Sequence, residues 1–492
     1  MNMGTLSLLV FSPFIGLIAL LLAGKQSDNI TKRIAAFSSL IPLILSILVY
    51  AQYQAGSGLS EILRWVQFEV GEQTLTLNYE LAVDGFSVIL ILLTTIIAVL
   101  AVFTSSWQIK QNSHLFFMLM FLLEFGILGV FSADNLILFF IFFEITLIPM
   151  FFLIGKWGGT DREESAFSYI IYNGLGSMVL LIAIAAIFVT AGTTNFSEAA
   201  EYFRTSNEAG LQLGIAIAFL IAFGVKLPIF PLHSWMVKVH VHAPPALVMI
   251  HAGVLLKIGA YGLIKFGVGI LPASFTTLAP LIAILGLVNL LYGAYLALVQ
   301  EELRSVLAYS SISHMGIILL GVAALNEAGI QGAIFQSVSH GLISALFFLL
   351  VGILLVRTRT TNLRKLSGLA RLTPVLAGFF LVAALAGLGL PGMSGFVSEF
   401  TVFLGIFENM PVIGAIGTLG IIMTVVYMLR AILKMTYGTY RNMFGDMNDL
   451  GMGELIPATI LLICIVVIGV YPNTIALTVQ QTLETLLVGI GG

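Results

Sequence analysis

Long apolar stretches separated by short polar ones dominate the pattern of residues along this chain. A stretch of about 20 apolar residues is long enough to cross a bilayer as a helix. The stretches are uniformly apolar rather than alternating, which argues against a membrane β-barrel. We therefore expect an all-α integral membrane protein with about fourteen transmembrane helices, at residues 4–23, 33–52, 84–104, 114–132, 134–155, 166–192, 210–241, 243–267, 274–298, 302–322, 329–356, 374–409, 411–429 and 455–474.

Composition agrees with this interpretation. Hydrophobic residues make up 59% of the chain and charged residues only 9%, whereas soluble domains are about 25% charged. The single cysteine, Cys464, lies in an apolar stretch, so neither a disulfide framework nor a cysteine metal site is expected. The sequence contains no Walker A, Rossmann or haem-attachment pattern. We expect no cofactor and no metal in this chain, and nucleic acid is not an expected partner.

The distribution of basic residues predicts the orientation. Of the 21 lysines and arginines, 16 fall in odd-numbered loops, counted from the first, and three in even-numbered loops. Cytoplasmic loops carry the excess of Lys and Arg, so the odd loops should be cytoplasmic and both termini should face outward. The remaining two basic residues, Lys226 and Lys257, fall inside spans.

Several charged residues interrupt the apolar spans. A charge at the bilayer centre costs about 2.5–3.5 kcal/mol even on the insertion scale, and such residues usually serve a function. A structural ion pair would explain any one of them, but both signs recur along the chain. Burial favours the neutral form of a lysine, whereas a nearby glutamate favours its charged form. Such groups can load and release a proton, and the candidates are Glu124, Glu144, Lys226, Lys257 and Glu399, with Asp134 at a span edge.

Spans 7 and 12 are too long for single helices, and each contains prolines in a related pattern. Gly224-Val-Lys-Leu-Pro228 and Gly387-Leu-Gly-Leu-Pro391 both read G-x-x-L-P. Proline removes a backbone donor and glycine permits departure from the helix. Broken helices five spans apart indicate two five-helix repeats, spans 4–8 and 9–13, and an odd-numbered repeat must be inverted. Ordinary proline kinks are the alternative explanation.

Histidines with serine neighbours lie between the two breaks. His251 precedes Lys257 on span 8, and His314 and His340 lie on spans 10 and 11. A lone buried histidine is more often a hydrogen-bonded core residue than a functional group. Here a hydrated polar line from Lys257 toward Glu399 is the interpretation we favour, because two of the histidines are accompanied by Ser310, Ser311, Ser313, Ser337, Ser339 and Ser344.

The stretch LHSWMVKVHVHAPPALVMIHAGVLLKIGAYGLIKF, residues 232–266, resembles the antiporter-like proton-pumping subunits of respiratory complex I, most closely the NuoM type, the bacterial counterpart of mitochondrial subunit 4. FFEITLIPMFFLIGKWGG, VSHGLISALFFLLVGILLVRTRTTNLRKLSGLA and GLPGMSGFVSEF add to the resemblance, which covers residues 80–440. The chain departs from the frequent pattern W-L-P-x-A-H, because it reads Trp235-Met-Val-Lys-Val-His240.

The resemblance implies a fourteen-helix fold with two inverted repeats and one proton pathway in the chain. It places the family's key glutamate on Glu144, its broken-helix lysine on Lys226 and its central lysine on Lys257. The terminal ionisable residue falls on Glu399, where sister subunits have lysine. We add His251, His314, His340 and Glu124 as supporting candidates. The expected domains are residues 1–112, 113–267, 268–436 and 437–492.

The resemblance further implies a proton-translocating subunit of an NADH:quinone oxidoreductase. Iron–sulfur clusters, flavin and quinone would then belong to partner subunits, and the partners would be adjacent antiporter-like subunits, the quinone-reducing peripheral arm and the bilayer. A subunit of a multi-subunit Na⁺/H⁺ antiporter, or of a membrane-bound hydrogenase, is the alternative. The expected location is the bacterial plasma membrane, with a thylakoid membrane as the other possibility.

Overall fold

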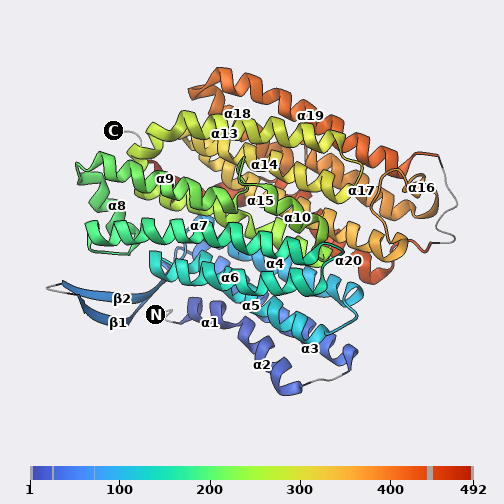
Figure 1. Ribbon diagram of the computed structural model, residues 1–492, viewed down its shortest axis with the longest axis horizontal. Helices are drawn as coiled ribbons and strands as arrows, with labels where there is room; N and C mark the ends of the chain where they lie inside the picture. Colours follow the sequence, from blue (N-terminus) through green and yellow to red (C-terminus); the bar gives the residue numbers. More distant parts are fainter. Residues whose placement is uncertain (1–3, 25–26, 71–72, 440–446, 489–492) are drawn as a thin grey trace.

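Long helices packed side by side form the body of the computed structural model, which describes residues 4–24, 27–70, 73–439 and 447–488 (Figure 1). Within these residues, twelve helices are long and apolar enough to cross a membrane, and the bent pair α1 (Thr5–Phe11) and α2 (Pro13–Ala23) adds a thirteenth. The fourteenth expected span is the broken pair α17 (Pro374–Gly387) and α18 (Ser394–Asn409). The helical membrane fold predicted from the sequence is therefore confirmed.

The twelve long spans follow the chain in order. They are α3 (Asp28–Gln54), α4 (Gly85–Gln108), α5 (Ser113–Ser132), α6 (Leu136–Trp157), α7 (Arg162–Ala191), α9 (Ala209–Lys226), the span Pro245–Val268, α13 (Pro272–Val299), α14 (Leu303–Ala324), α15 (Glu327–Thr358), α19 (Pro411–Thr436) and α20 (Met452–Val470). Shorter helices are α8 (Phe196–Thr205), α10 (Ser234–His242), α16 (Leu369–Leu372) and α21 (Asn473–Leu487).

The span Pro245–Val268, called span 8 below, is not a uniform α-helix. It consists of α11 (Pro245–Ile250), the π-helical turn η1 (His251–Leu255), α12 (Lys257–Gly262) and a second π-helical turn, η2 (Leu263–Val268). Single π turns inside α-helices occur frequently at functional sites. The two π turns flank the segment that begins with Lys257.

A β-hairpin, which the hydrophobic pattern did not predict, extends from the helical body (Figure 1). Its antiparallel strands are β1 (Ser60–Val70) and β2 (Gln73–Ala82). We call this side of the molecule the hairpin end. The backbone N–H of Leu6 in α1 donates to Glu61 at 2.6 Å, and Gly85 at the start of α4 donates to Thr482 of α21 at 2.8 Å. The first and last described helices therefore both contact the hairpin end, as an even number of spans requires.

Two short backbone bridges, at opposite ends of the helices, have matching places in the two expected repeats. Asn135 before α6 pairs with Asn195, and Glu302 before α14 pairs with Asn362; both pairs are separated by 60 residues. Asn135 also caps α6 by accepting from Ile137 and Leu138, and Glu302 caps α14 by accepting from Ser305. The same local structure is thus built twice, which fits an inverted repeat.

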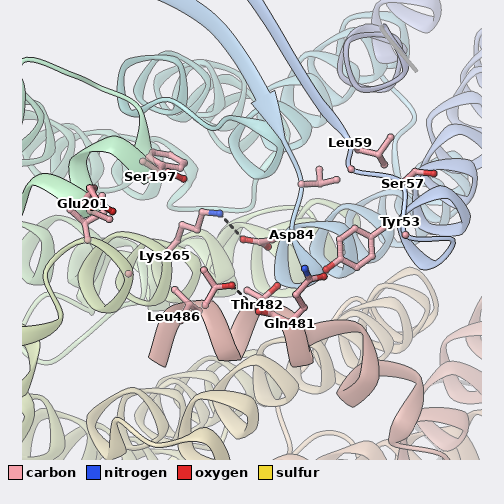
Figure 2. A pocket seen from close by; sticks show the side chains of 18 of the residues that line it. Tyr53, Ser57, Leu59, Asp84, Ser197, Glu201, Lys265, Gln481, Thr482 and Leu486 are labelled. Carbon is pink, nitrogen blue, oxygen red and sulfur yellow. Dashed lines mark hydrogen bonds and ion pairs between the residues drawn. The ribbon is translucent and has the colours of Figure 1, made fainter. Parts of the chain in front are cut away.

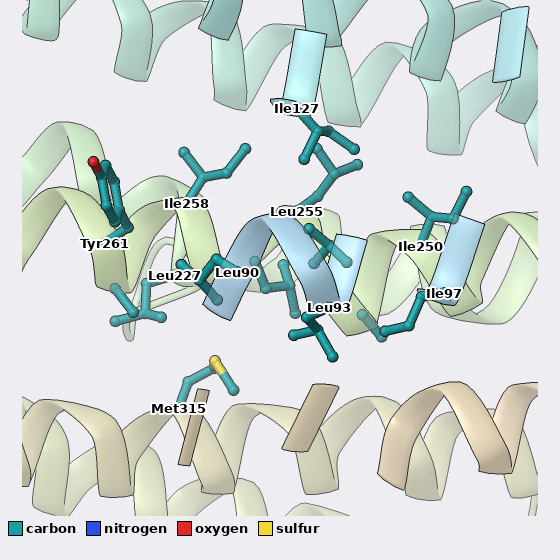
Figure 3. Packing of buried hydrophobic residues seen from close by; sticks show 14 of the residues in the cluster. Leu90, Leu93, Ile97, Ile127, Leu227, Ile250, Leu255, Ile258, Tyr261 and Met315 are labelled. Carbon is teal, nitrogen blue, oxygen red and sulfur yellow. The ribbon is translucent and has the colours of Figure 1, made fainter. Parts of the chain in front are cut away.

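Span 8 is the centre of the molecule. Every residue in an apolar 18-residue stretch of span 8 is buried. In the corresponding stretches of α14 and α15, 94% of the residues are buried, whereas in those of α7 and α19 only 33% are. Figure 3 shows how Ile127 of α5 and Met315 of α14 approach span 8 from opposite sides. Apolar packing of this kind excludes water around any charged group on span 8.

Close contact between α13 and α14 depends on small residues. A Cβ added at Gly316 would lie 2.5 Å from both the backbone O of Gly286 and the backbone N of Leu290. A Cβ at Gly293 would lie 2.6 Å from the backbone N of Ser313. Small residues allow helix backbones to approach closely in a membrane.

We expect Gly316→Val to reduce the amount of assembled complex several-fold, because overpacking costs about 1–3 kcal/mol and the neighbouring backbone cannot yield easily. Native gel analysis of membranes would measure this. Gly378→Val is the control, since a Cβ there meets no atom within 4 Å. Equal assembly of both variants would contradict the tight α13–α14 contact.

Candidate functional site

Lys226 is the last residue of α9 and is buried at the point where span 7 breaks. The helix stops there, residues 227–233 are irregular, and α10 resumes at Ser234. Lys226 is 1% exposed, and its Nζ has no hydrogen-bond partner within the described residues. Instead, Nζ lies 4.8 Å from the ring centroid of Phe143 and 5.6 Å from that of Tyr169. Aromatic faces attract a cation without accepting its protons in hydrogen bonds.

Glu144 lies on α6 near this lysine without bonding to it. The residue is half-buried, and its Oε1 is buried without a hydrogen-bond partner in the described part of the chain. The carboxylate acts electrostatically on Tyr169 and Lys226, but these charges form no ion pair within 4.0 Å. Glu144 and Lys226 are therefore neighbours in the same electrostatic environment, not a closed salt bridge.

Two buried histidines follow toward the middle of the molecule. His240 of α10 and His251 of span 8 share a hydrogen bond, Nε2 to Nδ1, at 3.0 Å. The ring of His251 lies 6.1 Å from that of Tyr169, beside Lys226, and 5.5 Å from that of Trp235. His240 is completely buried, because α10 enters the protein.

Lys257 is completely buried on span 8, and its Nζ contacts two acceptors. It donates to the backbone O of Ala252 at 2.7 Å and is hydrogen-bonded to Nδ1 of His340 on α15 at 2.7 Å. Ala252 belongs to the π turn η1. The bonds to the Ala252 carbonyl and to His340 hold the ammonium group of Lys257 between span 8 and α15.

The line continues from His340 to Glu399. The rings of His340 and His314 are 5.3 Å apart, and Nε2 of His314 lies 3.7 Å from Oε1 of Glu399 on α18. A small cavity is lined by both histidines and by Ser310, Ser311 and Ser344. The centre of a water molecule can occupy about 10 Å³ of it. This is about the space that one water needs. Three of the six serines predicted to accompany the histidines therefore line this cavity.

Glu399 is held beside the break in span 12. Gly389, in this break, has φ +78°, and a Cβ there would lie 2.6 Å from Oε2 of Glu399. In the shared pattern G-x-x-L-P, Gly389 stands where Lys226 stands in the first repeat. The absence of a side chain at Gly389 makes room for the Glu399 carboxylate.

Glu124 and Asp134 lie away from the line traced by these contacts. Glu124 on α5 is 2% exposed, and its Oε1 has no hydrogen-bond partner in the described residues. Asp134 lies at the hairpin end, where its backbone O accepts from Asn195. Within the described residues, no hydrogen bond, ring contact or ion pair joins either residue to Lys226 or Lys257.

A larger polar cavity, of about 510 Å³, opens at the hairpin end (Figure 2). In the wall of this cavity, Lys265 donates to Asp84 at 2.6 Å. Asp84 also accepts from Ser87 and so caps α4. This ion pair joins the hairpin end of span 8 to α4 and is separate from the central line.

Sequence reasoning missed two further polar residues at the site. Asn289 of α13 bonds to the break in span 7, and Arg304 donates from Nε to the backbone O of His240 at 2.9 Å. Arg304 is only 8% exposed. Neither residue has a local signal, because their partners are backbone groups more than 58 residues away in the chain. No group of three or more His, Cys, Asp or Glu within the described residues could hold a metal ion.

Residues 133–425 match the protein family described as NADH:quinone oxidoreductase/Mrp antiporter, TM. This region is more than half of the chain and contains Glu144, Lys226, Lys257 and Glu399. The chain belongs to this family. Relatives include an NAD(P)H-quinone oxidoreductase chain 4 of Thermosynechococcus vestitus, 42% identical over 86% of this chain and 83% of that protein. The NADH-quinone oxidoreductase subunit M of Rhodobacter capsulatus is 33% identical over 96% of this chain and 94% of that protein.

Solved structures give the same result for the fold. A chain of respiratory complex I from Thermus thermophilus, with bound NADH, superposes with a TM-score of 0.87 at 25% identity, over 99% of this chain and 100% of that chain. A chain of the archaeal membrane-bound sulfane sulfur reductase superposes with a TM-score of 0.86 at 29% identity, over 97% of this chain and 78% of that chain. The family resemblance proposed from the sequence is therefore confirmed.

We expect Gly389→Ala to displace the Glu399 carboxylate, because the new Cβ would overlap Oε2 and the residue would be strained at positive φ. A displacement of about 1 Å in a reacting group can cost on the order of 100-fold in rate, so proton transport through the chain should fall at least several-fold. Proton uptake by vesicles containing the purified complex would measure it. Gly378→Ala serves as the control, and an unchanged rate in Gly389→Ala would contradict this account.

Proposed function

We propose that this chain is the proton-translocating membrane subunit of a complex I-type quinone oxidoreductase and that protons cross it along the line from Lys226 to Glu399. The observation that carries the proposal is a spatial series of buried ionisable groups between the two broken helices. The closest links are Lys257–His340 at 2.7 Å, His240–His251 at 3.0 Å and His314–Glu399 at 3.7 Å. Isolated ionisable groups would be costly in a membrane, and a connected series of them is what proton transfer requires.

Each member of the line has the chemistry that its place demands. Within the described residues, Nζ of Lys226 has no hydrogen-bond partner and lies against the rings of Phe143 and Tyr169. The Lys257–His340 contact joins two nitrogens that can each carry a proton, so a proton can move along this bond. Glu399 lies beside His314 and accepts the proton at the far end. The small cavity beside the histidines gives one water room to bridge their rings.

In this proposal, the charge on Glu144 controls whether Lys226 holds or releases its proton. When Glu144 is ionised it stabilises the ammonium form of Lys226, and when it is neutral Lys226 releases its proton more readily. The half-buried position of Glu144 leaves it open to a neighbouring subunit. Glu124, buried away from the line, remains the weakest of the relay candidates.

Redox chemistry would take place outside this chain. The relatives are named as NAD(P)H-quinone or NADH-quinone oxidoreductase subunits, so flavin, iron–sulfur clusters and quinone would be held by partner subunits. Adjacent antiporter-like subunits and the quinone-reducing arm are the expected partners. Proton movement here would then respond to conformational or charge changes that begin elsewhere in the complex.

Division into residues 1–112, 113–267, 268–436 and 437–492 fits this mechanism. The matching backbone bridges Asn135–Asn195 and Glu302–Asn362, at opposite ends of the helices, support two inverted repeats at 113–267 and 268–436. The bias of basic residues to odd loops supports outward-facing termini. The membrane would be a bacterial plasma membrane or, given cyanobacterial relatives, a thylakoid membrane.

A Na⁺/H⁺ antiporter subunit is the second candidate, because the matching family description includes Mrp antiporters. The naming of the relatives and the glutamate at position 399 favour the oxidoreductase. Measurement of pumping by the purified complex with and without Na⁺ separates the two. Transport that requires Na⁺ and continues without quinone reduction would establish the antiporter instead.

We expect Lys257→Arg to fail as a replacement for lysine. Guanidinium stays charged and cannot return its proton, so quinone-coupled pumping should fall on the order of 100-fold or more, the contribution expected of a proton-transfer group. Pumping normalised to quinone reduction in reconstituted vesicles is the measurement, with native gels to show assembly. Parent activity in the arginine variant would mean that only the positive charge matters there.

Glu399→Gln should block transfer while the complex still assembles, since glutamine matches glutamate in size but cannot exchange a proton. Glu399→Asp should retain partial activity, because the carboxyl group remains but is withdrawn from His314. The ratio of protons pumped to quinone reduced distinguishes these variants. If Glu399→Gln pumps at the parent ratio, protons do not pass through Glu399.

A further inference from the structure

The break in span 7 is held by one side chain from the other half of the chain. Asn289 lies on α13, in the second expected repeat, and is completely buried. Its Oδ1 accepts from the backbone N–H of Phe230 at 2.7 Å, and its Nδ2 donates to the backbone O of Pro228 at 3.1 Å. Both bonded residues lie in the break that follows Lys226.

These bonds satisfy backbone groups that the helix cannot. Leu227 and Ile229 still find carbonyl partners on α9, at Phe223 and Gly224. The N–H of Phe230 and the carbonyl of Pro228 instead bond to Asn289. Backbone groups without water must be paired inside a membrane protein, and a side-chain amide supplies a donor and an acceptor together.

The location of Asn289 is itself fixed by tight packing. It lies between Gly286 and Gly293 on α13, and those glycines contact α14 with almost no intervening side chain. Its own Cβ would lie 3.0 Å from a Cβ at Gly316. The amide group therefore has little freedom, and whatever it bonds is held relative to α13 and α14.

Lys226 has no comparable anchor of its own. Its Nζ lacks a hydrogen-bond partner in the described residues and is surrounded by the rings of Phe143 and Tyr169. The position of the ammonium group thus depends on where the backbone of α9 ends. Pro228, two residues further along, is the point at which Asn289 fixes that backbone.

We propose that Asn289 is a positioning residue for Lys226, through which the second repeat sets the place of the first repeat's proton-carrying lysine. This inference rests on the proposed function, in which Lys226 exchanges protons. The Asn289 side chain bonds to none of the proton-carrying groups. It acts through the backbone of the break in span 7. Any displacement of α13 relative to α9 would move Lys226 with respect to Glu144 and so alter its protonation.

The test compares Asn289→Leu, which keeps the size of the side chain but removes both hydrogen bonds, with Asn289→Ser, which keeps a shorter polar group. Ser274→Ala is the control, because Ser274 is a buried polar residue of α13 that is far from the break. Lys226→Ala is examined in parallel. For each purified complex, three quantities are measured: assembly on native gels, protons pumped per quinone reduced across a pH series, and hydrogen exchange of a peptide covering residues 227–233.

We expect Asn289→Leu to assemble, to exchange faster at residues 227–233, to pump several-fold fewer protons per quinone, and to shift the pH dependence of pumping by on the order of one unit. Asn289→Ser should show smaller changes of the same kind and covers the case in which the leucine variant does not assemble. Ser274→Ala should match the parent protein in all three measurements.

Faster exchange with the parent pumping ratio and pH profile would overturn the inference, since Asn289 would then be only structural. Unchanged exchange would overturn it as well, because the bonds would not be holding the break. If Lys226→Ala impairs pumping but the Asn289 variants do not, this inference fails alone. If Lys226→Ala pumps at the parent ratio, the proposed proton line fails and this inference with it.

Discussion

Backbone polar groups inside a membrane protein must find partners within the protein, and the arrangement of this chain depends on that requirement. Two spans are broken, and each break frees backbone groups that a continuous helix would pair. Side chains from distant segments supply the missing bonds: Asn289 for Phe230 and Pro228, Arg304 for the backbone O of His240, and Trp235 for the backbone O of Val225. These bonds keep Lys226 and His240 in place, and the line of ionisable groups begins there.

The two breaks bring ionisable groups to corresponding places by different routes. In the first repeat the charge is carried by Lys226, which comes before its proline. In the second repeat the corresponding residue is Gly389, and the carboxylate of Glu399, from the helix after the break, lies beside it. The two breaks share the pattern G-x-x-L-P, but one has a lysine and the other a carboxylate at this place.

Apolar packing is as important to this arrangement as the polar contacts. Span 8 is completely buried, and side chains from α4, α5 and α14 surround it (Figure 3). In such surroundings electrostatic effects between charged groups reach further than in water, so Glu144 can influence Lys226 without touching it. Similar folds in respiratory complex I and in an archaeal sulfane sulfur reductase complex show that this helical unit accompanies different redox partners.

The sequence by itself determined the membrane class, the spans, the two broken helices and the family, because hydrophobic length, proline patterns and charge placement are local properties. It also singled out Lys257, His340, His314 and Glu399, since ionisable residues are conspicuous in apolar surroundings. Only the tertiary structure decided which of them touch. Lys257 pairs with His340, 83 residues away, and Glu144 does not close an ion pair with Lys226. Asn289, the π turns of span 8 and the burial of His240 were equally out of reach, because each depends on bonds to backbone groups or on packing between helices, and neither leaves a periodic signal in the chain.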